Sequence, residues 1–99
     1  MRLSQFEIEN IKNLAKHHFG HDVIVILFGS RANDEMRGGD IDLFIKSNNR
    51  NLNARAKMNF IVDLILKIGE QKIDVVLDNK SLHTTEFFKT ILRTGKQLC

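Results

Sequence analysis

Three aspartates lie in strongly apolar sequence. Asp40 and Asp42 alternate with apolar residues in the segment 40–46, and Asp74 interrupts the apolar segment 73–77. On a β-strand, carboxylates two residues apart share one face at a separation of roughly 7 Å, and a third from a neighbouring strand would complete a set of oxygen ligands suited to Mg²⁺. With no compensating lysine or arginine expected nearby, the three charges should repel one another unless a cation binds. The pattern predicts a metal site built from Asp40, Asp42 and Asp74.

A second motif, Gly29–Ser30, follows the apolar run 23–28 directly. Glycine lets a phosphate approach the backbone closely, and a serine that begins a turn or helix offers amide and hydroxyl donors to phosphate oxygens. Arg31 and Arg37 could add positive charge, while Gly38–Gly39 would let the chain turn back toward Asp40. Carboxylates that hold Mg²⁺ opposite a phosphate-binding loop are what nucleotidyl transfer requires.

Other polar residues have two interpretations each. Arg31 either contacts a nucleotide or braces its own loop, and Lys46 and Arg50 either contact a triphosphate or acceptor or are solvated loop charges. The histidines at 17, 18 and 21 have the spacing of metal ligands, but positive charge is also favourable at a helix C-terminus, which is the simpler interpretation.

The elements that must position these residues follow from periodicity and caps. Ser4 and Glu7 form a capping box that opens a helix with Ile8, Ile11, Ala15 and His18 on one face, ending near Gly20. The β-branched run before Gly29 predicts a strand covered on both faces. We therefore expect an α+β fold, an α/β sandwich with a small sheet packed against helices, over these segments in order: helix to residue 20, strands 23–28 and 40–46, helix 53–68, strand 72–77, and a last helix from about Thr84 or Thr85 to Gly95 carrying Phe87, Phe88, Ile91 and Leu92.

The helix 53–68 is apolar nearly all round. The core-facing residues are predicted to be Met58, Ile61, Val62, Ile65 and Ile68, which leaves Phe60 and Leu64 on the opposite face. A chain this small does not easily cover both faces, so an interface with another protein, in a hetero- or homo-oligomer, is expected. The alternative is that the sheet covers one side and the terminal helix the other.

The joint order of motifs resembles the minimal nucleotidyltransferases of the DNA polymerase β superfamily, which pair with HEPN-domain toxins. The matching segments are residues 27–32, 39–43 and 72–76, and the interval 31–39 is one residue shorter than is commonest in that family. The resemblance implies that Gly29 and Ser30 hold the nucleotide's phosphates, with Arg31 beside them. It also implies that Asp40 and Asp42 bind the metals and that Asp74 is the third carboxylate.

The expected activity is transfer of AMP from ATP to a hydroxyl, with two Mg²⁺ ions and pyrophosphate as leaving group. The resemblance suggests a tyrosine of a HEPN toxin as acceptor, which would make the chain an antitoxin. A non-catalytic antitoxin that neutralises its partner by binding, and a small-molecule nucleotidyltransferase of the antibiotic-modifying type, are the alternatives. The residues do not choose between acceptors or nucleotide bases.

Length and composition set the remaining expectations. The 99 residues suit a single domain, 1–99, and the one cysteine, Cys99, excludes a disulfide framework within the chain. With no apolar run long enough to span a bilayer and no signal-peptide pattern, we expect a cytoplasmic protein without membrane attachment. The net charge of +3 arises in residues 50–99, where nine Lys/Arg face five Asp/Glu, and forms no basic stripe, which argues against direct nucleic-acid binding.

Overall fold

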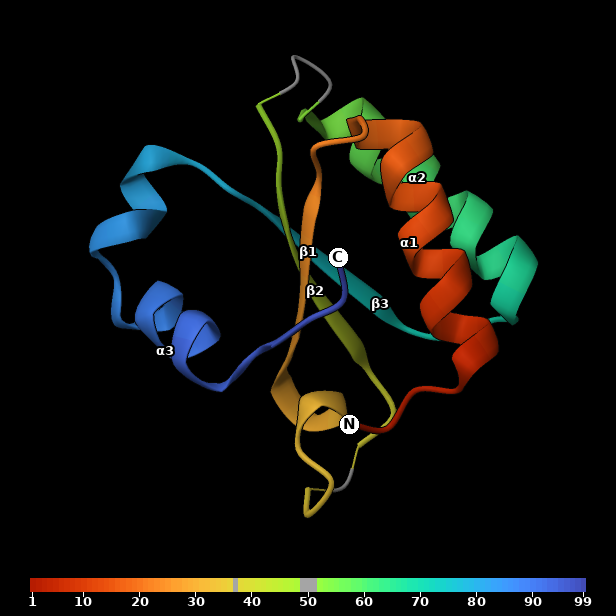
Figure 1. The fold of residues 1–99 in the computed structure, drawn as a ribbon, viewed down its shortest axis with the longest axis horizontal. Coiled ribbons are helices and arrows are strands. Elements are labelled where there is room, and N and C mark those ends of the chain that lie inside the picture. Colours follow the sequence, from red (N-terminus) through yellow and green to blue (C-terminus); the bar gives the residue numbers. More distant parts are fainter. Residues whose placement is uncertain (37, 49–51) are drawn as a thin grey trace.

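The computed structural model describes residues 1–36, 38–48 and 52–99. These residues form an α+β sandwich in which a mixed sheet lies between helices on its two faces (Figure 1), as predicted. The elements, in order, are α1 (Gln5–Phe19), β1 (Ile24–Phe28), the short 3-10 helix η1 (Gly29–Ala32), β2 (Ile41–Lys46), α2 (Ala54–Ile68), β3 (Ile73–Leu77), the short 3-10 helix η2 (Lys80–Thr84), α3 (Glu86–Thr94) and β4 (Lys96–Gln97).

The sheet has the strand order β3-β2-β1-β4. β2 and β3 are parallel and connected through α2, while β1 is antiparallel to both β2 and β4. β2 begins at Ile41 rather than at Asp40, and β3 begins at Ile73 rather than at Lys72. β4 was not expected, because a pair of residues carries no periodicity from which a strand could be predicted.

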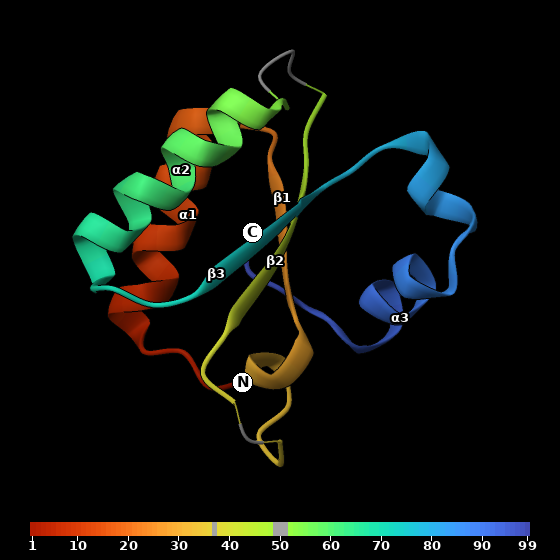
Figure 2. The same cartoon turned by 180° about the vertical axis from the view of Figure 1, so that it is seen from behind.

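One face of the sheet carries the main core. α1 and α2 lie side by side on it, which both views of the fold show (Figure 2). The predicted capping box is present, since Glu7 N–H donates to Ser4 Oγ at 3.0 Å and Ser4 N–H donates to Glu7 Oε1 at 2.9 Å. The buried side chains of this core include Ile11, Ala15, Phe19, Val25, Leu27, Leu43, Ile45, Phe60, Leu64 and Val75.

The face of α2 that packs into the core is only partly the predicted one. Phe60 and Leu64 are completely buried, whereas Met58 and Val62, which were expected inside, are 59% and 47% exposed. Ile61, Ile65 and Ile68 are partly buried at the edge of the same core. The prediction failed for Met58 and Val62 because apolar residues four apart occur on both sides of α2, so its periodicity alone does not select the buried side. Phe60 is buried against Phe19, at a centroid distance of 5.4 Å.

The second face of the sheet is covered by α3. The ring of Phe44 on β2 packs against Phe88 of α3 at a centroid distance of 5.7 Å, and Phe28 at the end of β1 packs edge-on against Phe87 at 5.6 Å. This cover is incomplete, because Ile24, Ile26 and Phe28 are only partly buried. The expectation that β1 is buried on both faces is therefore wrong for the face toward α3.

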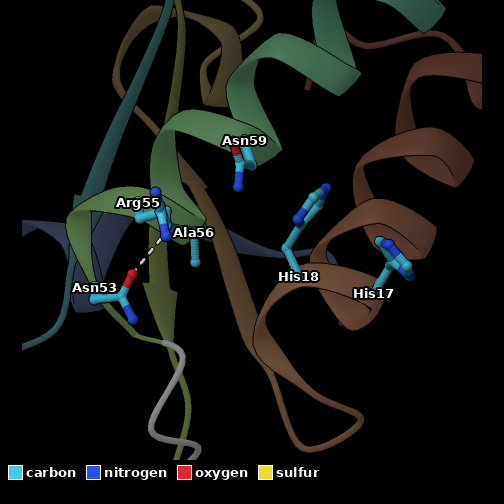
Figure 3. A pocket seen from close by; sticks show the side chains of 6 residues that line it. All are labelled: His17, His18, Asn53, Arg55, Ala56 and Asn59. Carbon is cyan, nitrogen blue, oxygen red and sulfur yellow. Dashed lines mark hydrogen bonds between the residues drawn. The ribbon is translucent and has the colours of Figure 1, made fainter.

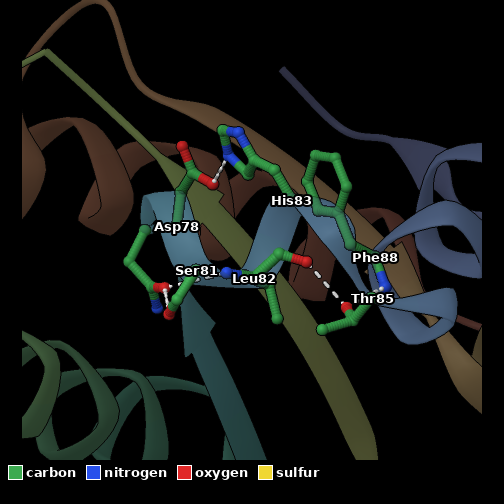
Figure 4. A network of polar contacts seen from close by, with 7 residues as sticks. Asp78, Ser81, Leu82, His83, Thr85 and Phe88 are labelled. Atoms are coloured by element: carbon green, nitrogen blue, oxygen red, sulfur yellow. Dashed lines mark hydrogen bonds and ion pairs between the residues drawn. The ribbon is translucent and has the colours of Figure 1, made fainter.

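A polar network fixes the start of α3 over the sheet (Figure 4). His83 Nε2 lies 2.6 Å from Asp78 Oδ1, and the His83 ring stacks on Phe88 at a centroid distance of 4.6 Å. Thr85 caps α3 by accepting a hydrogen bond from Phe88 N–H at 3.1 Å. The network thus connects the end of β3 with the first turn of α3.

In the part of the chain that the structure describes, no helix has both the length and the apolar character needed to cross a lipid bilayer.

Candidate active site

Phe28, Asp42 and Asp74 form a row across three adjacent strands. Asp42 on β2 pairs with Phe28 on β1 and with Asp74 on β3. Paired residues of neighbouring strands project from the same face of a sheet, and this face is the one partly covered by α3. Asp40 precedes β2 by one residue. The topology thus brings Asp42 and Asp74 together, as predicted.

The carboxyl of Asp42 is electrostatically unfavourable in this position. Its pKa is raised above the ordinary value, chiefly by burial and then by the negative charges of Asp74 and Asp40 and a hydrogen bond with Asp74. Lys72 opposes the shift and lowers the pKa in part. The site therefore favours positive charge close to Asp42.

Lys72 supplies some of that charge. Its Nζ atom lies 3.4 Å from Asp40 Oδ2 and 4.0 Å from Asp74 Oδ2. The expectation that the acids have no nearby cationic side chain is wrong. The sequence held the signal, because residues 72 and 74 are two apart at the start of a strand and so share a face.

A divalent cation fits the chemistry of this group but finds no ready-made ligand set. Within residues 1–36, 38–48 and 52–99, no three carboxylate, imidazole or thiol groups are gathered as in a formed metal centre. The donors are nonetheless hard oxygen ligands suited to Mg²⁺, and the pKa of Asp42, raised first by burial and then by the charges of Asp74 and Asp40, shows that its ionised form lacks sufficient positive charge nearby. Asp40, Asp42 and Asp74 would hold the ion after Lys72 moves aside.

The glycine motif is tied directly to the carboxylates. Gly29 has a positive φ of 72°, and a Cβ atom built on it would collide with Oδ2 of Asp42. Gly38 has φ 148°, and a Cβ atom there would lie 2.7 Å from Ser30 Oγ. The absence of a side chain at Gly29 thus lets its backbone lie against Asp42, whereas the absence of one at Gly38 leaves room for the Ser30 hydroxyl.

Arg31 braces its loop. Its guanidinium donates to the carbonyl oxygens of Arg2 and Gly39, each at 3.0 Å, and to Gln71 Oε1 at 3.1 Å. These contacts support the second of its two interpretations, and a direct contact with nucleotide stays a prediction.

Arg2 is a site residue that the sequence did not reveal. Its guanidinium donates to the carbonyl oxygens of Ser30 at 3.1 Å and Gly38 at 2.9 Å, and its backbone N–H donates to Arg31 O at 2.7 Å. Arg2 and Arg31 thus hold the two glycine-containing segments together from both sides. Only the fold brings residue 2 to residues 30 and 38, so local sequence carried no signal.

The remaining predicted charges lie apart or outside the description. Lys46 is exposed at the far end of β2 from Asp42. Arg37 and Arg50, which were considered as phosphate contacts, lie outside the described residues.

The histidines do not form a metal site among the described residues. His18 Nε2 lies 2.7 Å from Asp63 Oδ2, and the His17 ring packs edge-on against His18. Both histidines line a pocket of about 280 Å³ between α1 and α2, together with Asn53, Arg55, Ala56 and Asn59 (Figure 3). Because α1 and α2 cover the other face of the sheet, this pocket is separate from the carboxylates.

Comparison with protein families identifies the family of this chain. A family model described as "Polymerase beta, Nucleotidyltransferase" matches residues 9–99, a range that contains Gly29, Ser30 and all three aspartates. A search of curated proteins found no match. The match over nearly the whole chain agrees with the order of the motifs and with their assembly at one end of the sheet. The chain belongs to the polymerase β nucleotidyltransferase family, and this membership supports nucleotidyl transfer as its general chemistry.

Proposed function

We propose that this protein transfers AMP from ATP to a hydroxyl group of a protein acceptor. The observation that carries the proposal is the pairing of Asp42 with Asp74 directly beside Gly29, which joins the expected carboxylate and phosphate sites in one place. The raised pKa of Asp42 is consistent with it, because carboxyl groups with perturbed pKa values cluster at functional sites.

The residues have distinct roles in the proposed reaction. The backbone at Gly29 and the Ser30 hydroxyl would bind the β- and γ-phosphates. The acceptor oxygen forms a bond to the α-phosphorus as the bond to the β-phosphate oxygen breaks, and pyrophosphate leaves in line. Asp74, on the outer strand of the row, would orient the acceptor hydroxyl and accept its proton. Mg²⁺, held by Asp40, Asp42 and Asp74, would supply neutralisation of phosphate charge.

The acceptor we propose is a tyrosine of a HEPN-domain toxin, so that the chain acts as an antitoxin. The support for this partner is the resemblance to the minimal nucleotidyltransferases. The chain contains no tyrosine and cannot be its own acceptor of that type.

A protein partner is also supported by the surface of α2. Met58, Val62 and Leu66, spaced four apart on one side of α2, form an apolar stripe, and Leu66 is 77% exposed. We call these residues the α2 stripe. Apolar side chains in a continuous row on an otherwise polar surface are typical of interfaces. We assign the α2 stripe to the partner, away from the carboxylates on the other face of the sheet.

Lys72 gives a specific reason to test a second function, that of an antitoxin which binds its partner without catalysis. Its ion pairs with Asp40 and Asp74 partly neutralise the acids without a metal. A protein of this kind would keep the α2 stripe but would not depend on its carboxylates.

The test uses the chain co-expressed with the protein encoded in the adjacent reading frame. The pair is incubated with Mg²⁺ and ATP labelled in either the α- or the γ-phosphate, and the partner is examined by intact-mass spectrometry. Transfer of α-label with the mass of an adenylyl group is expected, and γ-label should not appear. Asp42→Asn should abolish transfer, whereas Glu86→Gln, at an exposed ion pair on α3, should leave it unchanged.

The variants also separate the two functions. If the wild type transfers no AMP and Asp42→Asn still neutralises the partner, the protein acts by binding alone and the catalytic proposal is overturned.

A further inference from the structure

An apolar pocket adjoins the carboxylate row on its β1 side. It has a volume of about 360 Å³ and lies between the end of β1 and α3, lined by Phe28, Gly29, Met36, Phe87, Thr90, Ile91 and Thr94. Its volume is within the range typical of small-molecule sites. The nucleotidyl-transfer roles assigned above use Gly29 but none of the other lining side chains.

The pocket and the expected reaction centre share a wall. Gly29 lines the pocket, and its α-carbon also faces Oδ2 of Asp42, since a Cβ atom there would collide with that oxygen. Phe28 lines the pocket as well and pairs with Asp42 across the strands. A group bound in the pocket is therefore a near neighbour of any phosphate held beside Asp42.

The row across the sheet gives the two sides of Asp42 different characters. On the β3 side stand Asp74 and Lys72, which suit a hydroxyl and its proton. On the β1 side stand the ring of Phe28 and, packed edge-on against it, the ring of Phe87. An α-phosphate at Asp42 would have its acceptor on the polar side and its leaving pyrophosphate in line with that acceptor, at the backbone of Gly29 and Ser30. The apolar pocket beside Gly29 suits neither of these polar groups, which leaves it for the nucleoside attached to the α-phosphate.

We propose that this pocket holds the base of the donor nucleotide, with Phe28 and Phe87 as its aromatic contacts. The proposal rests on the proposed nucleotidyl transfer and deepens it. The seven lining residues include no charged side chain, so the pocket does not suit a phosphate group. An uncharged planar ring gains both from apolar burial and from stacking or edge contacts with the phenyl rings.

The test measures binding of two probes by isothermal titration calorimetry in Mg²⁺. ATP reports both parts of the site, whereas inorganic tripolyphosphate reports only the phosphate part. Phe87→Ala removes one aromatic wall, and Thr90→Trp fills the pocket from an exposed position of α3. Leu92→Ala is the matched control, because Leu92 is 56% exposed on the same helix and does not line the pocket, while Phe87 is 46% exposed.

The expected result is that Phe87→Ala and Thr90→Trp weaken ATP binding about tenfold or more, the scale of base–aromatic stacking. Tripolyphosphate binding should be unchanged in both, and Leu92→Ala should bind both probes as the wild type does. Circular dichroism verifies that each variant is folded.

Other outcomes overturn the inference in distinguishable ways. Unchanged ATP binding in both pocket variants would exclude the pocket as the base site and leave nucleotidyl transfer standing. An equal loss of ATP and tripolyphosphate binding would show that α3 supports the phosphate site and contacts no base. If the wild type binds neither probe, the proposed function fails and the base site fails with it.

Discussion

Gly29 and Asp42 lie so close together that the Asp42 carboxylate fits only because residue 29 has no side chain. A Cβ atom at residue 29 would collide with Oδ2 of Asp42, and the positive φ of 72° is itself unfavourable for any other residue. Gly29, the glycine of the expected phosphate site, is therefore also needed for Asp42 of the expected metal site to keep its position. The sequence suggested a different reason, close approach of a phosphate, and the structure adds the carboxylate.

Gly29→Ala should reduce AMP transfer by at least an order of magnitude, because Asp42 must move out of the row. Gly39→Ala is the control, since a Cβ atom there meets nothing within 4 Å and its carbonyl can still accept from Arg31. Transfer of labelled AMP is measured for both, with circular dichroism as a check of folding. Full activity of Gly29→Ala would show that the position of Asp42 is not critical.

The metal-free protein should lose stability as pH rises from about 4 toward neutrality. The raised pKa of Asp42, caused mainly by burial and then by Asp74 and Asp40, means that the folded chain binds its proton more tightly than the unfolded chain does. Unfolding therefore becomes easier as that proton is lost, and the decline ends above the folded-state pKa. Mg²⁺ should reverse the decline by binding only the folded state.

Asp74→Asn tests the same coupling. Removing one repelling charge should flatten the pH dependence of the melting temperature and weaken the response to Mg²⁺, whereas Glu86→Gln, at an exposed ion pair on α3, should alter neither. Melting temperatures are measured against pH in chelator and in excess Mg²⁺. Identical curves for wild type and Asp74→Asn would show that Asp74 does not interact with Asp42 and does not bind the cation.

Lys72→Met should lower the stability of the metal-free protein and tighten Mg²⁺ binding. The exposed ion pairs with Asp40 and Asp74 contribute no more than about 1 kcal/mol, but they compete with a cation for the same carboxylates. Lys89→Met, which breaks the ion pair with Glu86, is the matched control. The magnesium affinity is determined by calorimetry, and weaker binding by Lys72→Met than by the wild type would contradict the competition.

The packing of α2 gives a clear contrast between Leu64 and Leu66. Leu64→Ala should destabilise the fold by about 2–5 kcal/mol, because its side chain is completely buried against the sheet. Leu66→Ala should change stability by only about 0.5 kcal/mol. Urea unfolding of both variants measures the difference, and comparable losses would place Leu66 in the core.

Part of the fold and of the candidate site could be predicted from particular residues of the sequence. The strands and helices were predictable wherever one face alternates or a cap is present, as in the box formed by Ser4 and Glu7 and the alternation around Asp42. The same alternation placed Asp42 and Asp74 on matching faces, so the carboxylate pair followed once the strands were adjacent.

The failures have a common physical origin in contacts that join distant segments. α2 is apolar on two sides, and the side that carries Phe60 and Leu64 is buried by residues distant in the sequence, Phe19 among them. Arg2 reaches Ser30 and Gly38 only through the fold, and β4 exists only because β1 pairs with it. Such contacts leave no repeating pattern in the residues that make them.

The position of β3 at the outside of the sheet has a consequence for the size of what the protein can act on. Asp74 lies on this edge strand, with Asp42 one strand inward. A substrate that approaches Asp74 from beyond the sheet's border meets no further strand among the described residues, so the sheet itself does not limit the bulk carried behind the reacting hydroxyl. A folded macromolecule can present a single protruding side chain there as readily as a small metabolite can present one of its own oxygens.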